Sequence, residues 1–225
     1  MISEHISSAR AARLLLRAHR YGALCTLSQK FDGHPFGSIT PYLTDHDGSL
    51  LLFVSGLAEH TRNMLADSRV SLISHNQDDA RIETQGRVTV LGHAVHDAAR
   101  SDCAARYLRY FPEAERYLAL ADFNFFRITP SAIRYIGGFG DIHWVKPEHY
   151  RIAAADWARE EQALLEEFNG DEGKWLARFG QHPRMVGVDC DGFDIRAGGR
   201  LQRHPFTVQA TDAAHARSML LTAIL

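Results

Sequence analysis

Short strand-like segments separated by tight turns fill most of the first 150 residues, and this succession limits the possible folds more than any other feature. The expected strands cover residues 21–30, 36–44, 50–54, 69–74, 82–95, 123–128 and 132–136. The intervening turns carry Gly, Pro and Asp, as in Asp45–Gly48. Few helices interrupt the strands, whereas parallel strands need a long crossover connection, usually a helix. The pattern therefore predicts an antiparallel barrel, and the lack of a GxGxxG motif after a strand argues against a dinucleotide-binding domain.

A helix is expected over residues 2–20, with Ile6, Ala9, Leu14 and Leu15 on its apolar side and its arginines opposite. Gly22 is expected to end it. A second helical stretch, 97–120, is broken at Phe111–Pro112. Its Arg106, Arg109 and Arg116 are interpreted as a solvated face, and the phenylalanines of 123–126 as core.

The pattern changes near Pro147. A charged helix is expected over 156–179, followed by a hairpin around Asp191–Gly192, a strand over 204–209 and a last helix from Thr211. A chain of 225 residues has room for two domains. We therefore expect a barrel domain over 1–150 and a small α+β domain over 151–225.

Composition narrows the class of protein. A net charge of −2 gives no electrostatic reason to expect nucleic acid or an anionic membrane as a partner. No apolar stretch predicts a signal peptide or a membrane span. Three scattered cysteines, Cys25, Cys103 and Cys190, predict reduced thiols in a cytoplasmic protein. Asp189–Asp191 is interpreted as a hairpin rather than a metal site, and Cys190 has no histidine pattern for a thiol enzyme.

The stretch Ser55–Leu65 follows an apolar strand and opens a short helix. Ser55 is expected to cap this helix, and its first amides suit an anion. Thr61, Arg62 and Asn63 add a hydroxyl, a guanidinium and an amide, a set able to hold a phosphate monoester. An ordinary capped surface helix with a solvated Arg62 explains the same residues equally well, so both interpretations stay open.

Four segments, taken in order, resemble the flavin-binding split barrel of the pyridoxamine 5′-phosphate oxidase type. They are Phe36–Tyr42, Val54–Ala58, Thr61–Asn63 and Gln85–Arg87. A fifth, Tyr135–Trp144, resembles the Gly-Phe-Gly loop of the haem-utilisation branch of these proteins, and residues 156–225 resemble the small domain that follows the barrel there. The resemblance implies an α+β fold, an antiparallel split β-barrel with flanking helices and a small C-terminal α+β domain.

The resemblance also implies FMN as the cofactor, bound in a homodimer. The implied FMN-binding residues are Gly37, Ser38, Pro41, Ser55, Leu57, Ala58, Thr61, Arg62, Asn63, Gln85 and Arg87. Asn63 stands where the oxidase has a second cation, which suggests weaker binding of the flavin phosphate. If FMN binds, most of the reaction chemistry belongs to the cofactor.

Haem is the alternative cofactor, and its iron needs an axial ligand such as a neutral imidazole. His143, after the glycine-rich loop and beside Trp144, is the first candidate ligand, and Asp141 is a guess for a polar residue near bound oxygen. The other candidates are His5, His60, His204 and His215. The family's His-Asn-x-Asp-His run reads Phe168–Glu172 here, so both of its histidines are missing.

Three function classes remain open. The first is an FMN-dependent oxidoreductase of unknown substrate, and the second is a haem-binding or haem-degrading protein on the same barrel. The third is a non-catalytic binding or regulatory protein. No catalytic residue and no metal site is assigned from the sequence.

Overall fold

The computed structural model describes residues 2–77, 81, 84–153, 157–170 and 178–224. The chain forms two compact units, Met1–Arg151 and Ile152–Leu225. Within the described residues, no helix is long and apolar enough to cross a membrane.

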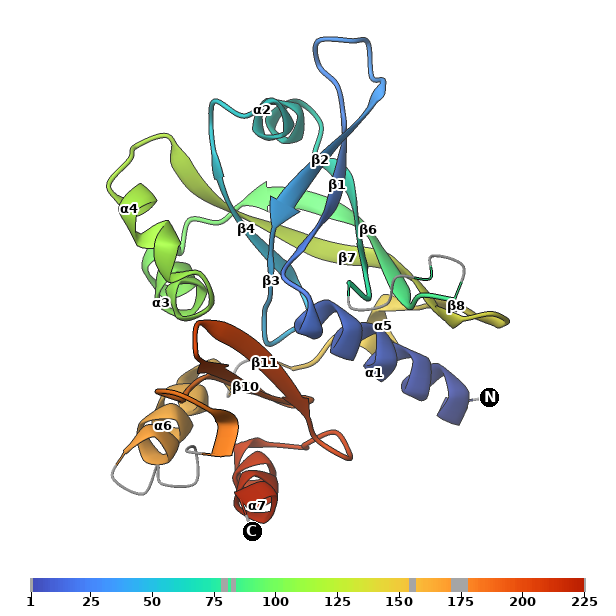
Figure 1. Cartoon of the computed structure of the whole chain (residues 1–225). Helices are drawn as coiled ribbons and strands as arrows, with labels where there is room; N and C mark the ends of the chain where they lie inside the picture. Colours follow the sequence, from blue (N-terminus) through green and yellow to red (C-terminus); the bar gives the residue numbers. More distant parts are fainter. Residues whose placement is uncertain (1, 78–80, 82–83, 154–156, 171–177, 225) are drawn as a thin grey trace. The chain divides into compact units, whose positions relative to one another are not determined.

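The first unit is a curled antiparallel sheet with helices around it (Figure 1). Its strands are β1 (Tyr21–Leu27), β2 (Pro35–Pro41), β3 (Leu43–Thr44), β4 (Leu50–Ser55), β5 (Arg69–His75), β6 (Arg87–His96), β7 (Phe123–Gly138) and β8 (Asp141–Val145). They pair in the order β2-β1-β5-β6-β7-β4-β3, and β8 also pairs with β7. Alternate residues of these strands face one core, in which Leu24, Leu52, Leu72, Val90 and Ile128 are fully buried. The expected antiparallel split barrel is confirmed.

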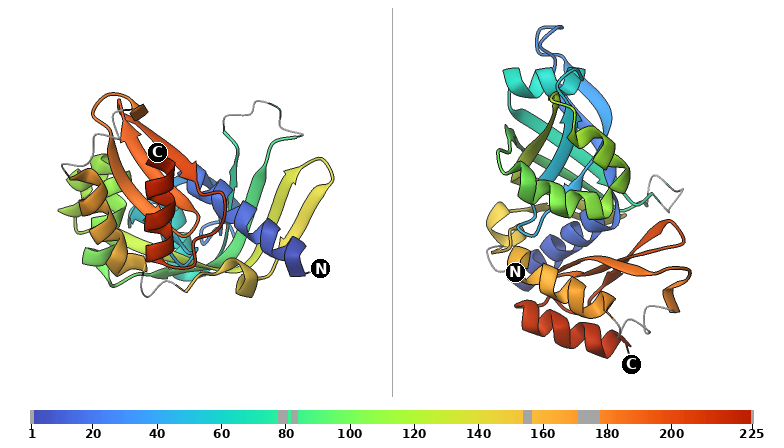
Figure 2. Two further views of the ribbon diagram at one scale, coloured as in Figure 1. Left: turned by 90° about the horizontal axis from the view of Figure 1, so that it is seen from below. Right: turned by 90° about the vertical axis from the view of Figure 1, so that its left-hand side faces the viewer.

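The helices of this unit are α1 (Ile2–Ala18), α2 (Glu59–Ala66), α3 (Arg100–Tyr110), α4 (Glu115–Leu118) and α5 (Pro147–Tyr150), with a 3-10 turn at Pro112–Ala114. The second view in Figure 2 shows α3 and α4 lying against one side of the sheet. The expected break at Phe111–Pro112 is confirmed, because α3 ends at Tyr110 and Pro112 opens the 3-10 turn. The helices α3 and α4 and the 3-10 turn between them form one wall of the pocket described below.

One long strand, β7, replaces the two strands expected on either side of Pro130. Proline has no amide hydrogen to donate to a neighbouring strand, so it is tolerated where the pairing is irregular. Pro130 lies opposite Gly92, where the register between β6 and β7 shifts: Gly92 pairs with Pro130 and Leu91 with Ala132. A Cβ on Gly92 would lie 2.4 Å from the Thr129 carbonyl oxygen, so glycine is required at this crossing.

The expectation for α1 needs correction. The helix ends at Ala18, and Gly22 lies inside β1, where a Cβ would come within 2.5 Å of the Ile73 carbonyl oxygen. Two of the arginines expected opposite the apolar side are buried. Arg13 donates a hydrogen bond to the Tyr150 carbonyl at 3.0 Å, and Arg17 donates to the Asp45 carbonyl at 3.2 Å.

Arg106 is likewise buried rather than part of a solvated face. It donates a hydrogen bond to the Thr44 carbonyl at 3.1 Å. Arg127, half-buried on β7, donates to Asp45 and to Asp97, each at 2.7 Å. These arginines satisfy carbonyl and carboxylate groups of the turn before β4 and of the segment that leads into α3.

The second unit packs α6 (Trp157–Asn169) and α7 (Ala213–Ile224) with an antiparallel sheet of β9 (Arg184–Asp189), β10 (Gly192–Ala197) and β11 (Arg200–Pro205). The hairpin at Asp191–Gly192 is confirmed. The last strand lies at 200–205 rather than 204–209 because a turn at Gly198–Gly199 returns the chain sooner. The expected helical residues 171–177 lie outside the described part.

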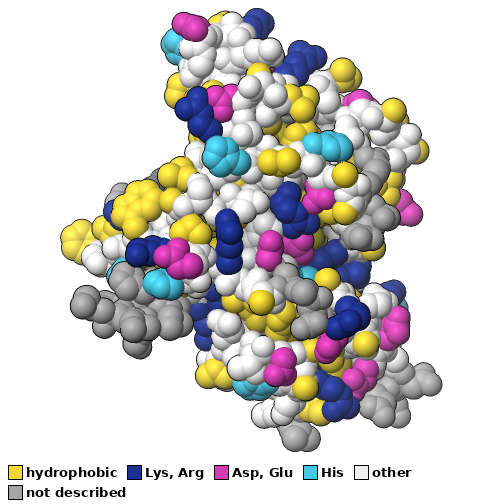
Figure 3. All heavy atoms as spheres, turned by 180° about the vertical axis from the view of Figure 1, so that it is seen from behind, with side chains coloured by type: hydrophobic (Ala, Val, Ile, Leu, Met, Phe, Trp, Pro, Cys, Tyr) yellow, Lys and Arg dark blue, Asp and Glu magenta, His cyan; other side chains and the backbone are white. Residues whose placement is uncertain are grey.

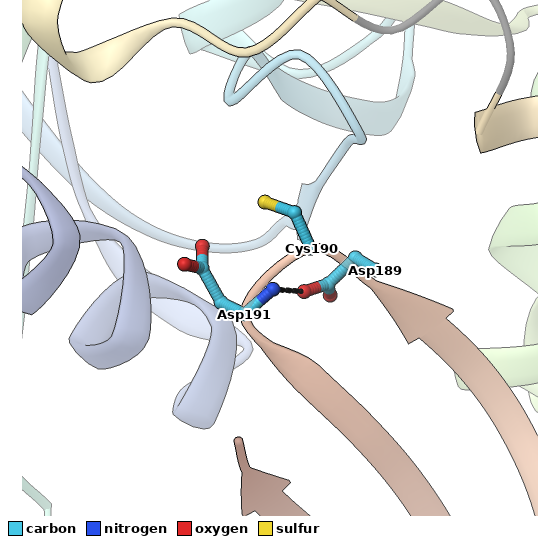
Figure 4. A group of neighbouring side chains, drawn as sticks. All are labelled: Asp189, Cys190 and Asp191. Carbon is cyan, nitrogen blue, oxygen red and sulfur yellow. Dashed lines mark hydrogen bonds between the residues drawn. The ribbon is translucent and has the colours of Figure 1, made fainter. Parts of the chain in front are cut away.

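The Asp189–Cys190–Asp191 group at the tip of this hairpin is occupied by internal contacts (Figure 4). One Asp189 oxygen accepts from the Asp191 amide at 2.8 Å. Both oxygens of Asp189 also accept from Arg203, at 2.7 and 2.8 Å, and Arg203 donates to Asp194 as well. The guanidinium already neutralises the Asp189 carboxylate, so this group closes a hairpin.

Candidate functional site

A pocket of about 380 Å³ lies where β2, β4 and the start of α2 face α3 and α4. Its lining comprises Ile39, Thr40, Pro41, Phe53, Val54, Ser55, Ala58, His60, Tyr107, Phe111, Glu113, Ala114, Arg116, Tyr117 and Phe123. The volume falls in the range of small-molecule sites. Of the residues that the sequence assigned to a cofactor, Pro41, Ser55 and Ala58 meet here.

A continuous set of aromatic rings forms much of this lining. Phe53 is central: its ring centroid lies 5.9 Å from Tyr107 and 5.3 Å from Phe123. Tyr107 stacks on Phe111 at 4.6 Å, and Tyr117 stacks on Phe123 at 4.7 Å. Such rings offer flat apolar faces to a planar ligand. Arg116, over the Tyr117 ring, is the arginine of the lining.

His60 is the polar group that distinguishes this pocket. Its Nδ1 lies 3.3 Å from Ser38 Oγ, while its Nε2 is buried and has no hydrogen-bond partner among the described residues. Burial lowers the pKa of His60, which favours the neutral imidazole. With the proton on Nδ1, His60 donates to Ser38 and keeps a lone pair on Nε2. An imidazole held in this way is suited to ligate a metal.

The wall residue Thr40 adds a second polar atom. Its side chain is buried, and its Oγ1 has no hydrogen-bond partner among the described residues. A buried hydroxyl without a partner costs free energy. His60 and Thr40 therefore give a largely apolar pocket two polar atoms that have no hydrogen-bond partner in the part of the chain that the structure describes.

The segment from Ser55 to Asn63, which was expected to bind a phosphate, is arranged differently from that expectation. Ser55 does not cap α2, which begins at Glu59 after Ala58; its Oγ donates to Asp122 at 2.6 Å and accepts from the Leu57 amide. Thr61 is buried, with its hydroxyl unpartnered among the described residues, whereas Arg62 is exposed. Consecutive residues of a helix face different directions.

Asn63, the third member of the stretch, is fully buried and holds the structure together. Its Oδ1 accepts a hydrogen bond from the backbone amide of Gln29 at 2.9 Å, and its Nδ2 donates one to Thr26 Oγ1 at 3.0 Å. The amide thus ties α2 to the end of β1. The structure does not gather the three polar groups of Thr61, Arg62 and Asn63 around one point.

The other predicted residues lie apart from the pocket lining. Gly37 is exposed on β2 with open space beside it, and Leu57 is 72% exposed. Gln85 precedes β6 instead of lying on it; it is buried and donates to the Asn76 carbonyl at 2.6 Å. Arg87, at the start of β6, donates to the Gln85 carbonyl.

His143 lies on β8, where its Nε2 is 2.7 Å from Asp141 Oδ1. The same hairpin carries exposed apolar side chains, with Phe139 at 95%, Trp144 at 56% and Ile142 at 46% exposure. In Figure 3, hydrophobic side chains gather over this hairpin, at the left edge of the view. His143 therefore belongs to an exposed hairpin and not to the pocket lining.

The remaining histidine candidates lie elsewhere. His204 and His215 belong to the second unit, and His215 contacts Thr211. The side chain of His5 lies outside the described part.

The aromatic wall from α3 and α4 was not predicted from the sequence. Tyr107 and Phe111 are four residues apart, which places them on one side of a helix, and this spacing was the available signal. Phe125 and Phe126 are core as expected, but Phe123 lines the pocket.

The fold and pocket together define a split-barrel protein with a second α+β unit. The family profile described as CREG, beta-barrel matches residues 3–151, and the chain belongs to this family. A non-canonical haem oxygenase of Arabidopsis thaliana chloroplasts, HOZ, is 29% identical over 236 residues, which cover 96% of this chain and 72% of that protein.

Solved structures share the fold. A protein of unknown function from Agrobacterium tumefaciens has a TM-score of 0.79 and 24% identity, covering 96% of this chain and 94% of that one. A haem-binding protein from Mycobacterium smegmatis has a TM-score of 0.59 and 23% identity, covering 96% of both chains. The likeness to these two structures extends over both units of the chain.

Proposed function

We propose that this protein binds haem in the aromatic pocket, with His60 as the axial ligand, and that it degrades haem. The observation that carries the proposal is the buried Nε2 of a neutral His60 within a ring-lined pocket, an atom that has no hydrogen-bond partner in the described part of the chain. The similarity to a haem oxygenase over nearly the whole chain supports it.

The residues present fit a bound haem. His60 Nε2 supplies a lone pair for the iron, and Ser38 holds the other ring nitrogen. The rings of Phe53, Tyr107 and Phe123 supply apolar contact for the macrocycle and exclude water. Arg116 offers a guanidinium to a propionate. When bound, haem iron supplies the oxygen chemistry, and the pocket controls access to it.

FMN is the second candidate cofactor. It is favoured because three of the residues that the resemblance implies for FMN binding, Pro41, Ser55 and Ala58, line the same pocket. An isoalloxazine ring there would compete with haem for the same aromatic faces. The homodimer implied by the resemblance belongs to both proposals, and the exposed Phe139 and Trp144 offer apolar surface for a second copy.

Haemin titration followed by absorption spectroscopy tests the proposal. His60→Ala is expected to weaken haem binding about 10–100-fold, because it removes the lone pair that the iron needs. His143→Ala is the matched control and should bind as the wild type does. Equal binding by His60→Ala and the wild type would reject His60 as the ligand. FMN uptake that Arg62→Ala abolishes, with no haem uptake by the wild type, would favour the flavin.

A further inference from the structure

One polar atom of the barrel pocket has no role in the binding of haem through His60. Thr40 lines the pocket, and only 1% of this residue is exposed. Its Oγ1 is fully buried and has no hydrogen-bond partner within the described residues. A buried hydroxyl in this state costs free energy, which a bound molecule that supplies a partner would recover. Thr40 is therefore a candidate contact for what the pocket binds.

The sheet fixes the position of Thr40. The residue lies on β2 opposite Gly22 of β1, inside the paired part of the strand. Side chains of a strand alternate between its two faces, so Thr40 and Ser38 project from the same face, about 7 Å apart along the strand. Ser38 is the residue whose Oγ lies 3.3 Å from His60 Nδ1. One strand thus carries both the residue that holds the proposed iron ligand and the buried hydroxyl.

Other polar side chains do not meet the same conditions. Thr61 also has a buried hydroxyl without a partner in the described part of the chain, but it does not line the pocket. Asp141, which the sequence suggested for a place near bound oxygen, lies 2.7 Å from His143 Nε2 on an exposed hairpin outside the lining. Ser55 lines the pocket, but its hydroxyl already makes hydrogen bonds within the chain.

A bound haem offers few hydrogen-bond acceptors to a buried hydroxyl. Its four pyrrole nitrogens bind the iron and its rim is hydrocarbon, which leaves the two propionates and the ligand on the iron opposite the axial histidine. Propionates are charged and favour a guanidinium and solvent, and Arg116 offers both because it is exposed. The buried Thr40 hydroxyl suits a small ligand on the iron instead, and donors of this kind influence how haem iron handles such a ligand.

We infer that the Thr40 hydroxyl donates a hydrogen bond to the small ligand that haem iron carries opposite His60. The inference rests on the proposed haem site and names a positioning residue within it. The β-branched threonine side chain has few rotamers, so the hydroxyl keeps its direction. The pocket then favours small ligands that accept hydrogen bonds strongly over those that accept them weakly.

The test compares two small ligands of the haem complex. Fluoride on ferric haem is a strong hydrogen-bond acceptor, whereas carbon monoxide on ferrous haem is a weak one. Thr40→Val keeps the shape of the side chain and removes the hydroxyl. In absorption titrations at constant pH, this variant should bind fluoride about tenfold more weakly and bind carbon monoxide and haemin within about twofold of the wild type. Thr40→Ser restores a hydroxyl and should recover most of the fluoride affinity.

Thr89→Val is the matched control, because it makes the same replacement on β6, outside the pocket lining. It should leave the fluoride affinity unchanged. Folding is checked on the chain without haem. Since the Thr40 hydroxyl has no hydrogen-bond partner among the residues that the structure describes, Thr40→Val should unfold at the wild-type temperature or above it.

Equal fluoride affinity in the wild type and Thr40→Val would overturn this inference and leave His60 as the proposed ligand. Weaker haemin binding by Thr40→Val with unchanged fluoride affinity would place the hydroxyl on a propionate, which would overturn it as well. Failure of the wild type to bind haemin would reject the proposed function itself, and this inference with it.

Discussion

At the residue scale, three consecutive positions of α2 have three different environments. Thr61 is buried, and its hydroxyl has no hydrogen-bond partner within the residues that the structure describes. Arg62 is exposed, and Asn63 is buried with both ends of its side-chain amide hydrogen-bonded. The sequence shows which side chains are present but not the directions in which they point, because the orientation of α2 relative to the sheet depends on tertiary packing. The phosphate-binding role of these residues stays a prediction.

Asn63→Ala should destabilise the fold by about 2–3 kcal/mol, because it removes two buried hydrogen bonds and leaves the Gln29 amide without its partner. Chemical denaturation measures this loss. The neighbouring Arg62→Ala changes an exposed side chain and should stay within about 0.5 kcal/mol of the wild type. Similar losses for both variants would contradict the structural role of Asn63.

At the scale of elements, most strands could be predicted from the sequence, because alternation and turn residues are local signals. The continuity of β7 through Pro130 could not be predicted, since it depends on a shift of register between β7 and its partner strand β6. The burial of Arg13 and Arg17 could not be predicted from the sequence for a similar reason. Their partners are backbone carbonyls distant in sequence.

Gly92→Ala tests this crossing of β6 and β7. The added methyl would meet backbone atoms of Thr129 that cannot move independently of the sheet, so a loss of about 1–3 kcal/mol or more is expected in thermal or chemical unfolding. Gly37→Ala, on a strand with open space beside it, is the control and should be close to neutral. A neutral Gly92→Ala would show that the strands do not approach this closely.

At the scale of the molecule, an ion-pair network joins distant parts of the barrel unit. Burial alone would raise the pKa of Asp45, but the charges of Arg106 and Arg127 hold it well below its ordinary value. Burial alone would raise the pKa of Asp97, but the hydrogen bonds from Arg127 and from the Ala99 backbone amide, together with the charge of Arg127, lower it. A carboxyl with a lowered folded-state pKa contributes stability above its unfolded-state pKa, and this contribution is lost as the pH falls through the folded-state pKa.

Asp45→Asn should therefore lower the free energy of unfolding by about 2 kcal/mol at pH 7. The difference from the wild type should shrink progressively below about pH 4, where the Asp45 carboxyl of the unfolded chain begins to take up a proton while that of the folded chain stays ionised. Urea unfolding at several pH values measures both effects. Asp67→Asn, which breaks an exposed pair with Arg69, should change little. A pH-independent difference for Asp45→Asn would rule out the ion pair as its cause.

The central claim is that His60 is the haem ligand in the barrel pocket, and rescue by imidazole tests it most directly. The absorption spectrum of the haem complex is recorded for the wild type, for His60→Ala, and for His60→Ala with added imidazole. We expect the variant to lose the wild-type Soret band and imidazole, entering the space left by the side chain, to restore it. A wild-type spectrum from His60→Ala without imidazole would show that His60 does not ligate the iron.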